Sequence, residues 1–143
     1  MRPPQEQCED ELAIDRELLP YVAEHLTALA LPFVTEGAVL LPELLQSLRV
    51  PLRQALFLVP TPDFQRRQYR LRPWVPMVLQ GCTDPEAAFD RWMQRDILFA
   101  QQVARQAQAA GYRVVWTDGS RTPVQGLADA LRWFGPEAEE DAR

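Results

Sequence analysis

Residues 55–72 read ALFLVPTPDFQRRQYRLR, and this stretch decides the fold because an apolar run passes directly into a basic helix. The run 55–59 is apolar at every position, which predicts a strand that is buried on both faces. Residues 61–63 are of the types that begin helices, and Pro73 should end the helix that follows. A strand that leads into a helix in this way is one step of a parallel α/β fold.

Two further runs favour strands. Residues 33–36 are β-favouring and stop at Gly37, and residues 112–117 form a second such run. Because the runs alternate with helices, we expect a single α/β domain over residues 1–135. Its core would be a partial doubly wound parallel sheet of three strands with flanking helices. The charged tail at 136–143 is expected to be disordered.

Helical spacing of apolar residues predicts the other elements. Residues 5–31 should form one helix or two, with a kink where Pro20 removes a backbone hydrogen bond. The longest helix should begin at Asp84, which can cap it, and end at Gly111. Shorter helical segments are expected over residues 42–48, 74–79 and 123–134.

The charges of the chain are unevenly distributed. The protein has 143 residues and a net charge of −5, and all fifteen of its basic residues are arginine. Residues 49–121 contain eleven of these arginines and six acids. Either a GC-rich coding sequence or selection for phosphate recognition explains the absence of lysine. An acidic chain argues against a general nucleic-acid binder, whereas its basic middle suits one small, highly charged ligand.

Other classes of function receive no support from the sequence. No apolar stretch approaches the roughly 20 residues of a membrane span, so we expect a cytoplasmic protein with no membrane partner. Cys8 and Cys82 are too few for a disulfide framework or a zinc site and should be free thiols. His25 is the single histidine and lies among apolar residues, so no Ser-His-Asp or Cys-His arrangement can be argued from it.

The carboxyl ends of the expected strands are the places where a ligand should bind, because ligands of open α/β sheets lie beyond those ends. Glu36 ends one strand, where it can coordinate magnesium through water or accept a proton from a substrate hydroxyl. The alternative is that Glu36 caps the next helix. Asp118, Gly119 and Ser120 follow another strand, and the glycine lets the backbone approach a base or a phosphate closely.

Arginines cluster after the strand at 55–59. Arg66 and Arg70 are four residues apart, so they share one helix face and could clamp a phosphate together with Arg72. The alternative is a solvated basic face. Arg91 and Arg95 form a second pair with the same spacing, although Asp96 could simply neutralise Arg95.

The order of these pieces resembles the P-loop nucleotide and small-molecule kinases over about Cys8 to Phe134. The resemblance rests on three segments, FVTEGA at 33–38, LFLVPT with its arginine helix from residue 56, and VVWTDGS at 114–120, with Arg95-Asp96 between the last two. It implies that ATP and Mg²⁺ serve the full-length parent, and that a nucleotide and a small-molecule acceptor are its partners. It also implies roles for single residues. The arginines of the lid that closes over the phosphates would be Arg66, Arg70 and Arg72, with Arg91 and Arg95 as further members. The loop beside the base would be Asp118, Gly119 and Ser120, and Glu36 would be the acid near magnesium and the acceptor.

One departure from the family is large. The loop Gly-x-x-x-x-Gly-Lys-Ser/Thr has no counterpart in this sequence, which contains no lysine. That loop supplies most of the electrostatics of phosphoryl transfer. We therefore expect a fragment of an ATP-dependent kinase in which the central strand is absent and the exposed sheet edges permit self-association. The alternative is a non-catalytic nucleotide-binding or protein-interaction module on the same scaffold.

Overall fold

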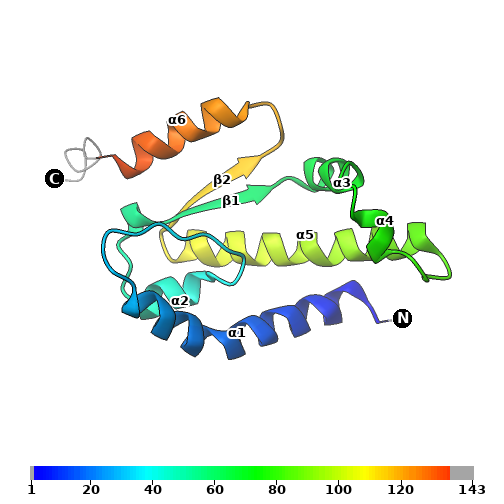
Figure 1. Ribbon diagram of the computed structural model, residues 1–143, viewed down its shortest axis with the longest axis horizontal. Coiled ribbons are helices and arrows are strands. Elements are labelled where there is room, and N and C mark those ends of the chain that lie inside the picture. Colours follow the sequence, from blue (N-terminus) through cyan, green and yellow to red (C-terminus); the bar gives the residue numbers. More distant parts are fainter. Residues whose placement is uncertain (1, 136–143) are drawn as a thin grey trace.

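The computed structural model describes residues 2–135, and helices make up most of it (Figure 1). The expected tail at 136–143 lies outside the described residues. The elements follow one another as α1 (Pro4–Ala28), α2 (Pro42–Ser47), a 3₁₀ turn η1 (Leu52–Gln54), β1 (Leu56–Pro60), α3 (Pro62–Arg70), α4 (Val75–Val78), α5 (Pro85–Ala109), β2 (Arg113–Thr117) and α6 (Pro123–Phe134).

The sheet within the described residues has two strands, β1 and β2, which run parallel. Leu56 lies opposite Arg113, and the register continues to Pro60 opposite Thr117. The connection between the strands passes through α3, α4 and α5, as a parallel crossover requires. The two strands predicted from residues 55–59 and 112–117 are thus present, each within a residue or two of the expected bounds.

The prediction of a three-stranded doubly wound sheet is wrong. Residues 33–36 lie in an exposed segment between α1 and α2, and Val34 is 99% exposed. The physical reason is that β-propensity reports how well a side chain fits a half-buried pleated surface, and not an intrinsic backbone preference. In residues 2–135 no strand pairs with this run, so its β-favouring residues have no such surface to fit.

The helix boundaries follow local signals in the sequence. α1 continues through Pro20, so this part of the chain forms one helix and not two. Asp84 caps α5 as expected, because its carboxylate accepts a hydrogen bond of 3.0 Å from the backbone N–H of Ala87. Thr122 and Gln125 form a reciprocal capping box at the start of α6. Proline is found at the beginning of most helices, where its missing N–H has no cost.

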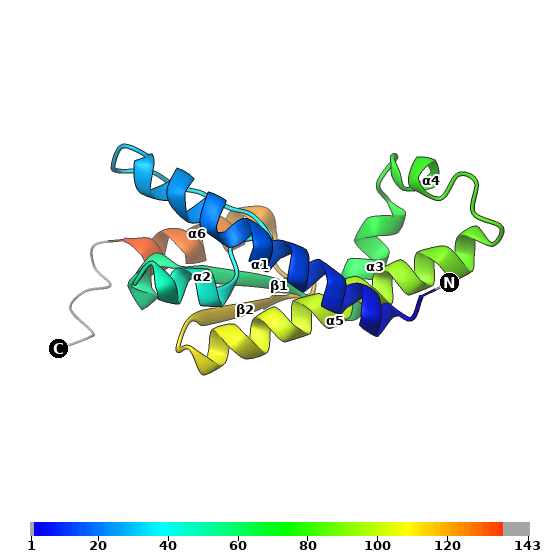
Figure 2. The ribbon, with the colours of Figure 1, turned by 90° about the horizontal axis from the view of Figure 1, so that it is seen from below.

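α5 carries the core, because α1 packs on one side of it and the sheet on another (Figures 1 and 2). Its buried and partly buried side chains contact three apolar clusters. One cluster joins α1 to α5 through Cys8 and Leu12, and a second joins β1 and β2 to α5 through Ala107. The third lies below α4 and includes Phe89 and Met93. None of the helices in the described part of the chain is long and apolar enough to cross a membrane.

One ion-pair group connects α1 and α5. Arg95 is 2.6 Å from the Asp96 carboxylate and 3.7 Å from that of Glu11 on α1. Burial raises the pKa of Asp96 above its usual range, and the hydrogen bond from Arg95 only partly opposes this. The ionised carboxylate therefore loses more from desolvation than it recovers from its partner.

We predict that Asp96→Asn does not destabilise the protein at pH 7. Since the folded pKa of Asp96 is raised, the stability that this carboxyl contributes is complete below its unfolded pKa, about 3.9. That contribution is lost as pH rises through the folded pKa. Asparagine avoids the loss, so the unfolding midpoint of the variant relative to wild type should rise between pH 3 and pH 7, as measured by thermal unfolding. A variant that becomes relatively less stable over this interval would show that the ion pair outweighs burial.

Candidate functional site

The carboxyl ends of β1 and β2 meet at one edge of the sheet. The backbone N–H of Thr61, directly after β1, donates to the carbonyl of Thr117 at the end of β2 over 2.9 Å. α3 begins at the next residue, so its first turns stand beside the turn at 118–120 that follows β2. Two of the three predicted strand ends are therefore brought together at this edge.

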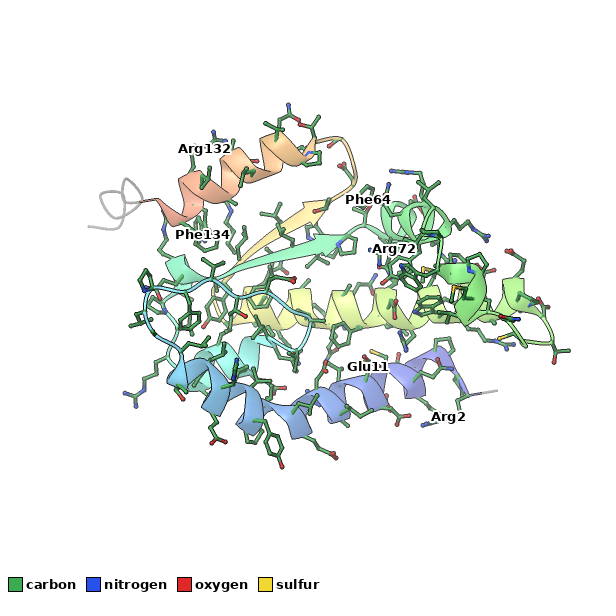
Figure 3. The ribbon with its side chains drawn as sticks, in the orientation of Figure 1. Arg2, Glu11, Phe64, Arg72, Arg132 and Phe134 are labelled. Carbon is green, nitrogen blue, oxygen red and sulfur yellow. The ribbon has the colours of Figure 1, made fainter. Side chains whose placement is uncertain are left out.

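α3 is held against that turn by a close approach of Phe64 to Gly119. Gly119 has a φ of +87°, and a Cβ added there would lie 2.7 Å from Cε2 of Phe64. Arg67 adds a hydrogen bond of 3.2 Å from Nη2 to the carbonyl oxygen of Asp118. Figure 3 shows Phe64 at the end of α3 that faces the sheet edge. Glycine is thus required both for the backbone conformation and for the contact.

The turn at 118–120 is locked by its own aspartate. Oδ1 of Asp118 accepts a hydrogen bond of 2.8 Å from the backbone N–H of Ser120. Hydrogen bonds from the side chain and backbone of Ser120, together with the nearby Arg67 guanidinium, lower the pKa of Asp118. The carboxylate is therefore charged at neutral pH, and one edge of the site is acidic.

Arg66 and Arg70 point from α3 to the amino-terminal half of α5. Nη1 of Arg66 lies 2.9 Å from Asp90, and Arg70 donates from both Nη atoms to Glu86 at 3.3 and 2.8 Å. The hydrogen bonds of this pair raise the pKa of Arg70 and lower that of Glu86. The shared helix face predicted for the two arginines is confirmed by their common partner helix. Both ion pairs lie at the surface.

Arg72 and Arg95 have other partners than Glu86 and Asp90, the acids that pair with Arg70 and Arg66. The guanidinium of Arg72 stacks on the rings of Tyr69 and Trp74, with centroids at 4.4 and 5.5 Å (Figure 3). Arg95 contacts Glu11 of α1, which Figure 3 shows on the side of α1 that faces α5.

The position of Arg91 follows from helical spacing. It precedes Arg95 by one helical turn and shares that side of α5, whereas Glu86 and Asp90 face α3. By helical spacing, Arg91 and Arg95 therefore start from a different face of α5 than Glu86 and Asp90, which pair with the arginines of α3.

Glu36 is not at a strand end. It is exposed in the segment between α1 and α2, so the expected convergence of three strand ends does not occur. Within residues 2–135, no three His, Cys, Asp or Glu side chains gather in a way that could hold a metal ion. Both cysteines are free, as predicted, and Cys8 is buried in the core.

Several residues of this region were not identified from the sequence. Gln65 on α3 is 5% exposed, and among the described residues its Oε1 has no hydrogen-bond partner. No pattern in the sequence marks it. Glu86 and Asp90, by contrast, repeat on α5 the four-residue spacing of Arg66 and Arg70 on α3. Matched spacing of opposite charges on two helices is a signal that could have revealed the pairing.

No protein-family model matches this chain, and comparisons with curated proteins and with solved structures found no match either.

We predict that Gly119→Ala destabilises the protein by about 1–3 kcal/mol, because it adds a steric clash with Phe64 to backbone strain. Gly81→Ala is the matched control: Gly81 has a φ of +88°, but no heavy atom lies within 4 Å of its Cβ position. Chemical denaturation of both variants separates the clash from the strain. In a protein that already carries Phe64→Ala, the change Gly119→Ala should cost less stability than it does in the wild type, because the ring that clashes is gone. Equal losses at both glycines would show that the Phe64 contact is unimportant.

Proposed function

We propose that this chain binds the phosphates of a nucleotide at the edge where β1 and β2 end. In this proposal it serves an ATP-dependent kinase that transfers a phosphoryl group to a small-molecule or nucleotide acceptor. One observation carries the proposal: α3 starts at the end of β1 and is fixed on the turn after β2, where Arg67 contacts Asp118. Arg66 lies beside it on α3 and reaches across to Asp90 of α5. Ligands of parallel α/β units bind beyond the same edge.

The arginines have the chemistry that phosphates need. A guanidinium donates two parallel hydrogen bonds to phosphoryl oxygens and stays charged. Arg66 is paired with Asp90, whose side chain is 55% exposed, and exposed ion pairs contribute only about 0–1 kcal/mol. A polyphosphate carries more charge than one carboxylate, so it can replace Asp90 at little cost.

The acidic turn orients the nucleotide. The charged Asp118 repels phosphate, so the phosphates belong on the side of Arg66 and the uncharged base on the side of Gly119. This orientation agrees with the resemblance, in which residues 118–120 lie beside the base. Gln65 adds a buried amide oxygen on α3 with no partner among residues 2–135, which supports a polar ligand near this helix.

The proposal assigns binding to this chain, and not the whole reaction. A lysine-bearing phosphate loop supplies much of the transition-state stabilisation in P-loop kinases, and this sequence has no lysine. The described residues do not form a magnesium cage, so Mg²⁺ would be held largely by the phosphates of the nucleotide.

A second candidate, a non-catalytic protein-interaction module, is favoured by one face of α6. Val124, Leu127, Leu131 and Phe134 follow helical spacing and are 53–76% exposed. Exposed apolar stripes of this kind mark interaction surfaces. Self-association through the sheet edges stays a prediction. Nucleotide titration separates the two candidates, because an interaction module alone would leave ATP and pyrophosphate unbound.

We predict that Arg66→Ala weakens binding of pyrophosphate and of ATP with magnesium roughly 10- to 150-fold, because it removes a charge-assisted hydrogen bond worth about 1.5–3 kcal/mol. Isothermal titration calorimetry measures the affinity. Arg105→Ala is the control, since Arg105 is an exposed arginine of α5 that is hydrogen-bonded to Gln102, away from the sheet edge. Equal affinities of wild type and Arg66→Ala would contradict the proposed site, as would an equal loss in the control.

We predict that the purified chain with ATP, magnesium and a panel of nucleosides and sugars releases no ADP above the blank. The reason is the missing lysine-bearing loop. A coupled assay for ADP provides the measurement, and Glu36→Gln is the control for catalysis by the chain itself. Turnover that Glu36→Gln abolishes would show that the chain is a kinase without such a loop.

A further inference from the structure

A cavity of about 740 Å³ that is broadly open to solvent lies between the end of α3, the short helix α4 and the start of α5. Residues of all three elements line it, among them Arg70, Val75, Met77, Leu79, Glu86 and Phe89. Its volume is within the range of about 300–1,000 Å³ that is usual for small-molecule sites. The cavity is separate from the sheet edge, where Arg67 contacts the turn after β2.

The inner wall of the cavity is apolar and firmly packed. Val75 is 5% exposed and Phe89 is 1% exposed, and both belong to the apolar cluster that includes Met93. Aromatic neighbours support this cluster, since Trp92 packs edge-on against Phe89 and Tyr69. The outer wall includes Met77, which is 72% exposed and whose flexible thioether can adapt to a ligand.

One cation stands at the rim of the cavity in a fixed position. The guanidinium of Arg70 lies 4.4 Å from the centroid of the Phe89 ring, which restrains it from one side. Both of its Nη atoms are directed to Glu86. Because a guanidinium binds carboxylate and phosphate with the same fork, Glu86 marks where the anionic group of a ligand would bind.

A ligand anion can easily replace Glu86 as the partner of Arg70. Their side chains are 51% and 72% exposed, so water screens their attraction. A ligand anion that is attached to an apolar body gains burial in the cavity in addition to the ion pair, and Glu86 has no such gain.

We infer that this cavity binds a small organic anion with an apolar body and one carboxylate or phosphate group. The body packs on Pro76, Met77 and Leu79, above the buried Val75 and Phe89. The anionic group replaces Glu86 on Arg70. The binding does not depend on nucleotide binding at the sheet edge, because Arg66 and Arg67 take no part in it.

Titration of the full chain with 1-naphthyl phosphate, 1-naphthoate and uncharged 1-naphthol tests the inference. We expect at least one of the two anions to bind about tenfold more tightly than 1-naphthol, and their comparison identifies the preferred head group. Arg70→Met keeps an apolar stem and should reduce the affinity of the anions to that of 1-naphthol. Glu86→Gln removes the competing carboxylate and should tighten anion binding severalfold.

Three further variants locate the site. Met77→Glu places a charge on the exposed wall and should weaken all three probes, while Arg105→Met should leave them unchanged. Loss of pyrophosphate binding in Arg66→Ala with retained naphthyl phosphate binding distinguishes this site from the nucleotide site. Equal affinity for all three probes, or anion affinities that neither Arg70→Met nor Glu86→Gln changes, would overturn the inference.

Discussion

Burial of the apolar side chains of α5 is the constraint on which the rest of the structure depends. Phe89 and Met93 pack with α4 and Ala107 packs with the sheet, and all three are at most 1% exposed. The partly buried Leu98, Phe99 and Val103 pack against the cluster of α1. A two-stranded sheet is marginal in water without such support. The strands therefore persist because Phe57 and Tyr112 pack on the helix, with ring centroids 5.7 Å apart, and not through their own ladder alone.

The elements that could be predicted from the sequence are those specified by local signals. Asp84 and Pro85 define the start of α5, and the run 55–59 defines β1, because capping and apolar patterning act within a few residues. The expected strand at 33–36 failed for the opposite reason, since a strand needs a neighbour that no local pattern reports. Of the predicted fold, the order of β1, helices and β2 with parallel strands is present, whereas the third strand is not.

The positions of the candidate site residues could be predicted from the sequence only in part. The meeting of α3 with the turn at 118–120 follows from parallel strands that end at the same edge. The placement of Arg95 does not, because the side of α5 that packs on α1 is decided by tertiary contacts such as Glu11. Gln65 could not be identified, since burial of a single amide leaves no mark in a sequence.

The forces that hold α3 determine whether its arginines are available to a ligand. The exposed pairs of Arg66 and Arg70 contribute little to stability, so they are not what fixes the helix. Tyr69 packs edge-on against Trp92 and Trp74, with centroids at 5.3 and 6.0 Å, and contacts of this kind contribute about 0.5–1.5 kcal/mol each beyond burial. At the other end of the helix, Phe64 contacts the turn at Gly119. Aromatic contacts position α3 at both ends. An anion can therefore replace the carboxylate partner of an arginine while α3 stays in place. The arginines are therefore preorganised by apolar packing and exchangeable in their ion pairs, and a binding site for anions needs both properties.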